Sequence, residues 1–114
     1  MYNIRRIDIG RGEETYQELS NKLKDLAQVL RRKFSASKII VFGSFARGDL
    51  NEGSDIDLII VGDFKAKFHK RIQDVIGLTD LPIEPLCYTE EEFRTMMANK
   101  NSFISEVMKD GVMI

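Results

Sequence analysis

The chain has 114 residues, of which 43% are hydrophobic and 31% are charged, and its formal net charge is -1. This length suits one domain with one core, so we expect residues 1–114 to form a single domain. No apolar stretch approaches the length of a membrane span, and residues 1–10 lack the apolar block of a secretory signal. The single cysteine, Cys87, is expected to be a buried reduced thiol, so the composition favours a cytoplasmic protein.

The first strong pattern predicts an amphipathic helix over residues 13–33, preceded by an edge strand over residues 2–9. Its apolar positions recur at helical spacing and are Tyr16, Leu19, Leu23, Leu26 and Leu30. The basic run at residues 31–33 closes this helix, where cations interact favourably with the helix dipole. A solvated helix end is the favoured interpretation, because the chain lacks the basic surplus of nucleic-acid-binding proteins. We therefore expect no direct contact with nucleic acid.

Two short apolar runs predict neighbouring strands over residues 37–42 and 55–61, and a glycine stops each of them. Between the strands, residues 44–48 have room for one helical turn, and residues 49–54 form a polar loop. A further helix is predicted to end at Gly77, with its apolar positions at Phe68, Ile72, Val75 and Ile76.

The last third of the chain predicts one more strand and two helices. Residues 82–88 form the strand, and its two prolines favour a sheet edge or a strand end because proline donates no ladder hydrogen bond. Thr89 and Glu92 form a capping box that starts the next helix. A final helix spans residues 102–109 and ends at Gly111. This order of elements predicts an α/β layer fold with a small sheet.

The chemistry of the chain is concentrated in Gly43-Ser44 and in Asp55-Ile56-Asp57, with ten residues between Ser44 and Asp55. Side chains alternate along a strand, so Asp55 and Asp57 share one face, where a cation would relieve their repulsion. Carboxylate pairs suit Mg²⁺, which completes its shell with water and phosphate oxygens. Gly43 permits a sharp turn, and Ser44 offers a hydroxyl and amides to phosphate. One ligand touches both segments only if the two strands run antiparallel.

The pattern G-S-x10-D-x-D after a strand resembles the DNA polymerase beta superfamily of nucleotidyltransferases. The length and the flanking sequence VFGSFARGDLNEGSDIDLIIV are similar to its smallest members, the minimal nucleotidyltransferases, over about residues 13–98. The resemblance implies a small mixed β-sheet flanked by helices. It also implies that Gly43 and Ser44 hold the triphosphate of ATP, and that Asp55 and Asp57 are catalytic Mg²⁺ ligands.

The third acidic residue of that family is usually an aspartate on the next strand, and the matching residue here is Glu84. The resemblance implies that Glu84 binds metal or accepts the proton of the attacking hydroxyl. The alternatives are a site that binds nucleotide with poor turnover and an exposed edge-strand glutamate, while Asp63 and Asp80 are rivals in predicted loops. Arg47 lies one helical turn past Ser44 and is either a phosphate ligand or a surface residue.

The minimal family is associated with a helical partner toxin of the HEPN ribonuclease type. The resemblance therefore implies an antitoxin that transfers AMP from ATP to a hydroxyl of this toxin, with tyrosine as the expected acceptor. A non-catalytic antitoxin that occludes its partner and a nucleotidyltransferase for a small molecule are the alternatives. Residues 96–114 are rich in apolar groups, which predicts packing on the core and, for the surplus, a partner surface in a homo- or hetero-oligomer.

Overall fold

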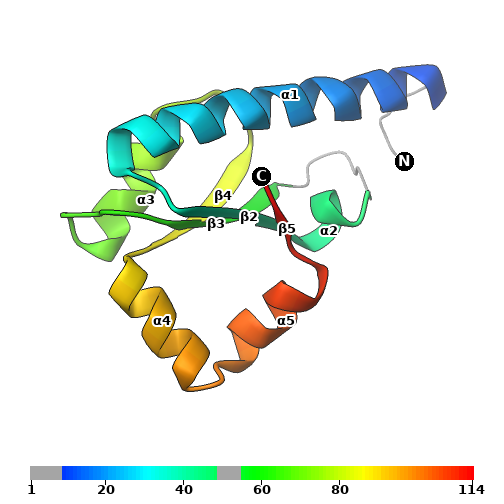
Figure 1. Ribbon diagram of the computed structural model, residues 1–114. Coiled ribbons are helices and arrows are strands. Elements are labelled where there is room, and N and C mark those ends of the chain that lie inside the picture. The colour runs from blue at the N-terminus through cyan, green and yellow to red at the C-terminus, as the bar shows by residue number, and fades with distance from the viewer. Residues whose placement is uncertain (1–8, 49–54) are drawn as a thin grey trace.

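The computed structural model describes residues 9–48 and 55–114, with side chains from residue 16 onwards. Three layers stack in Figure 1, with a thin sheet between a long helix and a pair of short helices. In chain order the elements are α1 (Ile9–Phe34), β2 (Lys38–Phe42), α2 (Gly43–Ala46), β3 (Ile56–Val61), α3 (Phe68–Ile76), β4 (Ile83–Tyr88), α4 (Glu90–Ala98), α5 (Ser102–Asp110) and β5 (Val112–Met113).

The strands of the described residues form a four-stranded mixed sheet in the order β4-β3-β2-β5. Strand β2 pairs antiparallel with both β3 and β5, whereas β3 pairs parallel with β4. The sheet is therefore small, mixed and flanked by helices, as predicted. The proline-containing strand β4 lies at an edge, which also agrees with the prediction.

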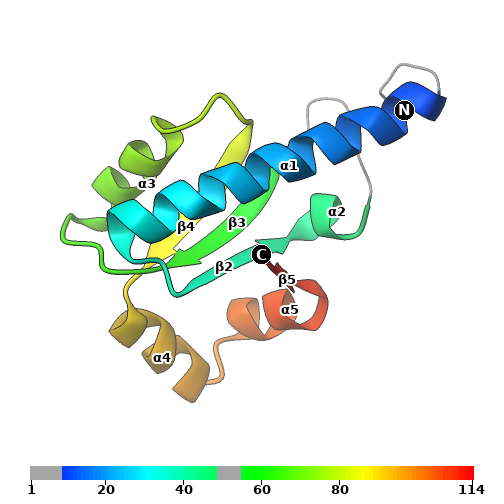
Figure 2. The same ribbon diagram turned by 45° about the horizontal axis from the view of Figure 1, so that its top comes forward.

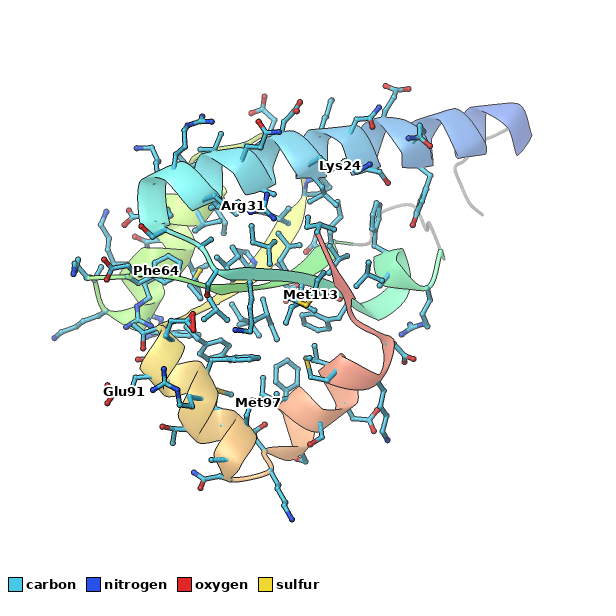
Figure 3. All side chains as sticks on the ribbon, in the orientation of Figure 1. Lys24, Arg31, Phe64, Glu91, Met97 and Met113 are labelled. Carbon is cyan, nitrogen blue, oxygen red and sulfur yellow. The ribbon has the colours of Figure 1, made fainter. Side chains whose placement is uncertain are left out.

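Apolar side chains fill the space on both faces of the sheet (Figure 3). On one face, α1 and α3 cover the larger core, which contains the alternating residues Ile56, Leu58 and Ile60 of β3. On the other face, α4 and α5 cover a smaller core around Ile59 and Val61. Both faces of β3 are thus buried, so its nearly continuous apolar sequence is explained by the two layers of helices.

The predicted elements are confirmed with small shifts at their ends. Helix α1 begins at Ile9 rather than at residue 13, so the predicted strand over residues 2–9 is wrong at Ile9, and residues 2–8 lie outside the described residues. The predicted loop at 49–54 also lies outside them. The capping box is present, since Thr89 accepts from the Glu92 amide and Glu92 accepts from the Thr89 amide.

Two features of the fold were not predicted. Strand β5 adds to the free side of β2, where Met113 pairs with Ile40 and the Ile114 amide donates to the Ile39 carbonyl at 3.0 Å. The guanidinium of Arg31 in α1 also donates to the Ile114 carbonyl.

Among residues 9–48 and 55–114, no helix is both long enough and apolar enough to cross a membrane.

Candidate active site

The phosphate turn, defined here as Gly43-Ser44, follows directly from the end of β2. Gly43 has a φ of +74°, a conformation that side-chain-bearing residues rarely adopt. A Cβ atom at this position would lie only 2.4 Å from Asp57 Oδ2. The glycine is therefore required twice, once by the backbone conformation and once by the close approach of the carboxylate. The sequence prediction of a tight turn is confirmed by this geometry.

Helix α1 contacts α2, the short helix that begins with the phosphate turn. Phe45 of α2 is buried, and its ring stacks on Tyr16 with centroids 4.8 Å apart and planes 20° apart. The Tyr16 hydroxyl also donates a hydrogen bond of 3.3 Å to the Phe45 carbonyl. Helix α2 is only one turn long, so these contacts fix its position better than its own hydrogen bonds do. The sequence placed Tyr16 on the buried face of the helix but carried no signal for its contact with α2.

Asp57 lies opposite the end of β2, where its α-carbon pairs with that of Phe42. The antiparallel pairing of β2 and β3 brings Asp57 next to Gly43, as the sequence argument required. Asp57 is half-buried, while Asp55 lies exposed just before β3 begins. Burial raises the pKa of the Asp57 carboxyl, the negative charge of Asp55 raises it further, and the positive charge of Arg47 opposes both effects.

Glu84 stands beside Asp57, because the parallel pairing of β3 and β4 aligns these two residues. Paired residues project from the same face of a sheet, so Glu84 and Asp57 lie on the α4/α5 side. Glu84 is exposed on the edge strand. Its rivals lie elsewhere: Asp63 pairs with Lys65 at 3.1 Å past the far end of β3, and Asp80 lines a hollow beneath α1.

Arg47 closes α2, where its backbone amide donates to the Gly43 carbonyl at 3.2 Å. Its side chain is exposed, and together with Gly43 it lines a hollow between α2 and α5. Its charge acts on Asp57, so the guanidinium and the carboxylates share one electrostatic environment. Both interpretations of Arg47, a phosphate ligand and a surface residue, stay predictions.

The residues present fit a divalent cation supported by substrate oxygens. Burial is the main cause of the raised pKa of Asp57, and a cation between Asp55 and Asp57 would offset the repulsion that adds to it. Within the described ranges, no three His, Cys, Asp or Glu side chains gather closely enough to hold a metal ion. Two carboxylates completed by phosphate oxygens and water are a typical set for Mg²⁺, which seldom has an all-protein cage. Glu84 is thus brought to the site by the strand register without closing a three-residue cage.

A carboxylate pair that faces a glycine turn at one end of a mixed sheet is typical of nucleotidyl-transferring enzymes. The model of the nucleotidyltransferase domain family matches residues 23–112 of this chain. The chain belongs to this family, whose members are transferases.

Relatives of known name agree with this class. A candidate protein adenylyltransferase of Methanocaldococcus jannaschii is 32% identical over 96 residues, which cover 78% of this chain and 87% of the relative. A second from the same organism is 51% identical over 43 residues, and the match covers 36% of this chain and 43% of that relative. The protein adenylyltransferase MntA of Thermococcus cleftensis is 37% identical over 46 residues, 40% of this chain and 46% of MntA.

The fold also has a solved counterpart. A crystal structure described as a candidate nucleotidyltransferase from Sulfolobus solfataricus superposes with a TM-score of 0.64. The superposition covers 97% of this chain and 90% of the other, at 20% sequence identity. At this identity the likeness concerns the fold, and it supports the mixed sheet between two layers of helices.

Proposed function

We propose that this protein is a Mg²⁺-dependent protein adenylyltransferase that transfers AMP from ATP to a hydroxyl group of a partner protein. The partner is a helical toxin of the HEPN type, the acceptor is a tyrosine, and the modification neutralises the toxin. The observation that carries this proposal is the alignment of Glu84, Asp57 and Gly43 across three neighbouring segments of one sheet end. Relatives that are named protein adenylyltransferases support the same reaction.

Each residue has a task in this reaction. Gly43 and Ser44 would receive the terminal phosphates of ATP, with Arg47 neutralising part of their charge. Asp55 and Asp57 would hold Mg²⁺, which supplies charge neutralisation at the phosphates and lowers the pKa of the attacking hydroxyl. The acceptor oxygen forms a bond to the α-phosphorus while the bond to the bridging oxygen breaks, and pyrophosphate leaves. Glu84 is placed to accept the hydroxyl proton.

The open edge of the sheet favours a macromolecular acceptor. No strand pairs with the outer side of β4 among the described residues, and Glu84 is exposed on this strand. A side chain of a partner protein can therefore approach Glu84 without displacing any described element of the fold. The match to the family and the named relatives makes AMP the expected group to be transferred.

The test combines the purified chain with α-labelled ATP, Mg²⁺ and a purified helical toxin of the HEPN type. We expect label on a tyrosine of that protein, and its loss by on the order of 100-fold or more in Asp57→Asn. Asp63→Asn is the matched control, because Asp63 is a carboxylate at the far end of β3. No label on the partner, or undiminished label with Asp57→Asn, would contradict the proposal.

One observation favours a second candidate function, an antitoxin that binds its partner and occludes it without chemistry. Glu84 replaces the usual aspartate, and the described carboxylates form no three-residue cage. The double substitution Asp55→Ala with Asp57→Ala separates the two functions. Neutralisation that persists in the double variant supports occlusion, whereas neutralisation that is lost while binding to the toxin is retained supports adenylylation.

A further inference from the structure

A hollow beside the phosphate turn is closed by a wall from α5 that has no role in the transfer chemistry described above. It has a volume of about 160 Å³ and lies between α2 and α5. One wall consists of Phe42, Gly43 and Arg47, and the other includes Phe103, Glu106 and Asp110 of α5. Figure 2 shows α2 at the end of β2, close to α5, and the two helices contact each other.

The hollow lies on the same face of the sheet as the carboxylates. Glu84, Asp57 and Phe42 occupy paired positions on β4, β3 and β2, so their side chains form one row across that face. Neighbouring strands lie about 4.8 Å apart, which makes Phe42 the immediate neighbour of Asp57 on the side away from Glu84. The row therefore has an open side at the edge strand β4 and a walled side at α5.

The walled side suits a flat aromatic ligand. The rings of Phe42 and Phe103 pack edge to face, with centroids 5.7 Å apart and planes 80° apart. Phe103 nevertheless keeps 40% of its surface exposed, which is high for a phenylalanine already in contact with another ring. An exposed aromatic ring beside a phosphate-binding turn offers a stacking partner of the kind that nucleobases use in proteins.

The two carboxylates that line the hollow favour a ligand that donates hydrogen bonds. Glu106 and Asp110 are four residues apart in α5, which places them on one face of the helix. Lys109 pairs with Glu106 at 3.0 Å. Asp110 and the second oxygen of Glu106 can accept hydrogen bonds, and a carboxylate accepts from an amino group but not from a carbonyl oxygen.

We propose that this hollow binds the base of the nucleotide and selects a base that carries an exocyclic amino group. The base stacks on Phe103 and donates to Glu106 or Asp110, while the phosphates lie over Gly43 and Arg47. The acceptor protein then approaches from the open β4 side. This inference rests on the proposed nucleotidyltransferase function, because it assigns the other end of the same substrate.

Equilibrium binding tests the inference without requiring turnover. Calorimetry in Mg²⁺ compares three probes: a non-hydrolysable ATP analogue, the inosine analogue that lacks the amino group, and tripolyphosphate. We expect the inosine analogue to bind about tenfold more weakly than the adenosine analogue. Phe103→Ala is expected to weaken the adenosine analogue about tenfold and to leave tripolyphosphate unchanged.

The double substitution Glu106→Gln with Asp110→Asn should reduce the preference for adenosine over inosine, because the acceptors lose their charge. Met108→Ala is the matched control on the same helix, since Met108 is exposed and lies outside the hollow. Equal binding of the three probes, or no effect of Phe103→Ala, would overturn the inference while leaving the transferase function intact. Base-selective binding without AMP transfer would support the inference and count against the proposed transferase function.

Discussion

Charged side chains pair with each other at one end of the sheet and repel each other at the other end. At the clamp end, defined by Arg71, Cys87 and Glu92, a buried arginine makes two hydrogen bonds to Glu92, at 2.7 and 3.3 Å. The same guanidinium donates to the carbonyls of Ala66 at 2.7 Å and Cys87 at 3.1 Å. At the other end, the carboxylates of Asp55 and Asp57 repel each other beside the phosphate turn.

The contrast appears in the pKa values. The hydrogen bond from Arg71 and the capping hydrogen bond from Thr89 lower the pKa of Glu92. Burial and the charge of Asp55 raise the pKa of Asp57. A folded protein gains stability from the first arrangement and none from the second. The comparison therefore separates a charge cluster whose members pair with each other from one in which two carboxylates repel each other.

The largest expected effect on stability comes from breaking the clamp end with Arg71→Met. Loss of the guanidinium leaves the Ala66 and Cys87 carbonyls without their donor and should lower the free energy of unfolding by about 3 kcal/mol. This is the lower end for a buried pair, because the Glu92 side chain is 45% exposed. Urea denaturation measures the loss. AMP transfer per folded molecule should stay at the wild-type level, and a large fall would show that the two ends are coupled.

At the end of the sheet that carries the candidate active site, Gly43→Ala is the substitution with the largest expected effect. The positive φ should destabilise the fold by about 1–2 kcal/mol, and the clash with Asp57 should lower AMP transfer on the order of 100-fold. Gly48→Ala is the matched control, because Gly48 has a φ of +83° but, among the described residues, no atom within 4 Å of an added Cβ. Equal loss of transfer in both variants would show that strain, rather than contact with Asp57, is responsible.

A smaller effect is expected where α1 supports the phosphate turn. Tyr16→Phe removes the hydrogen bond to the Phe45 carbonyl and keeps the stacked ring, so it should cost about 1 kcal/mol. We expect the KM for ATP to rise while kcat stays nearly constant, because in the proposed reaction the turn would bind ATP through its phosphates. Tyr88→Phe serves as the control on β4, at the clamp end. A change confined to the melting temperature would show that Tyr16 only stabilises the fold.

The smallest expected effect is on the pH dependence of stability. Because the pKa of Glu92 is lowered in the folded state, its contribution to stability is present above the ordinary glutamate pKa of 4.5 and is lost as the pH falls through the lower pKa of the folded state. Glu92→Gln should therefore flatten the loss of stability between about pH 5 and pH 3. Glu91→Gln, in the same helical turn, should leave that slope unchanged. Urea midpoints across this range provide the measurement.

The sequence predicted those parts of the molecule that depend on local patterns. Helical spacing located α1, β-branched runs located β2 and β3, and the capping box located the start of α4. The antiparallel order of β2 and β3 followed from requiring one ligand to touch Gly43 and Asp57. These signals lie within a few residues of one another, so they can be read without knowledge of the fold.

The contacts that were missed join residues far apart in the chain. Strand β5 has only two residues, both exposed, and it exists because they pair with Ile40 and Val41. The clamp joins Arg71 to Glu92, and the contact of Tyr16 with Phe45 spans 29 residues. Helical spacing puts Arg71 on the same face as Phe68 and Val75, but no local pattern identifies Glu92 as its partner. The sequence therefore predicted the residues of the candidate site itself. It did not predict the side chains that pack around them.

The place of two prolines at the edge of the sheet has a consequence for how other proteins meet this molecule. An exposed edge strand is normally a template on which a second chain can add a strand. Pro85 lies within β4 and removes an amide donor from its outer side, whereas Pro82 precedes the strand and faces β3, where its carbonyl accepts from the Ile56 amide. The edge beside Glu84 thus discourages self-association through main-chain pairing. It leaves the approach to the carboxylates open to a single inserted side chain.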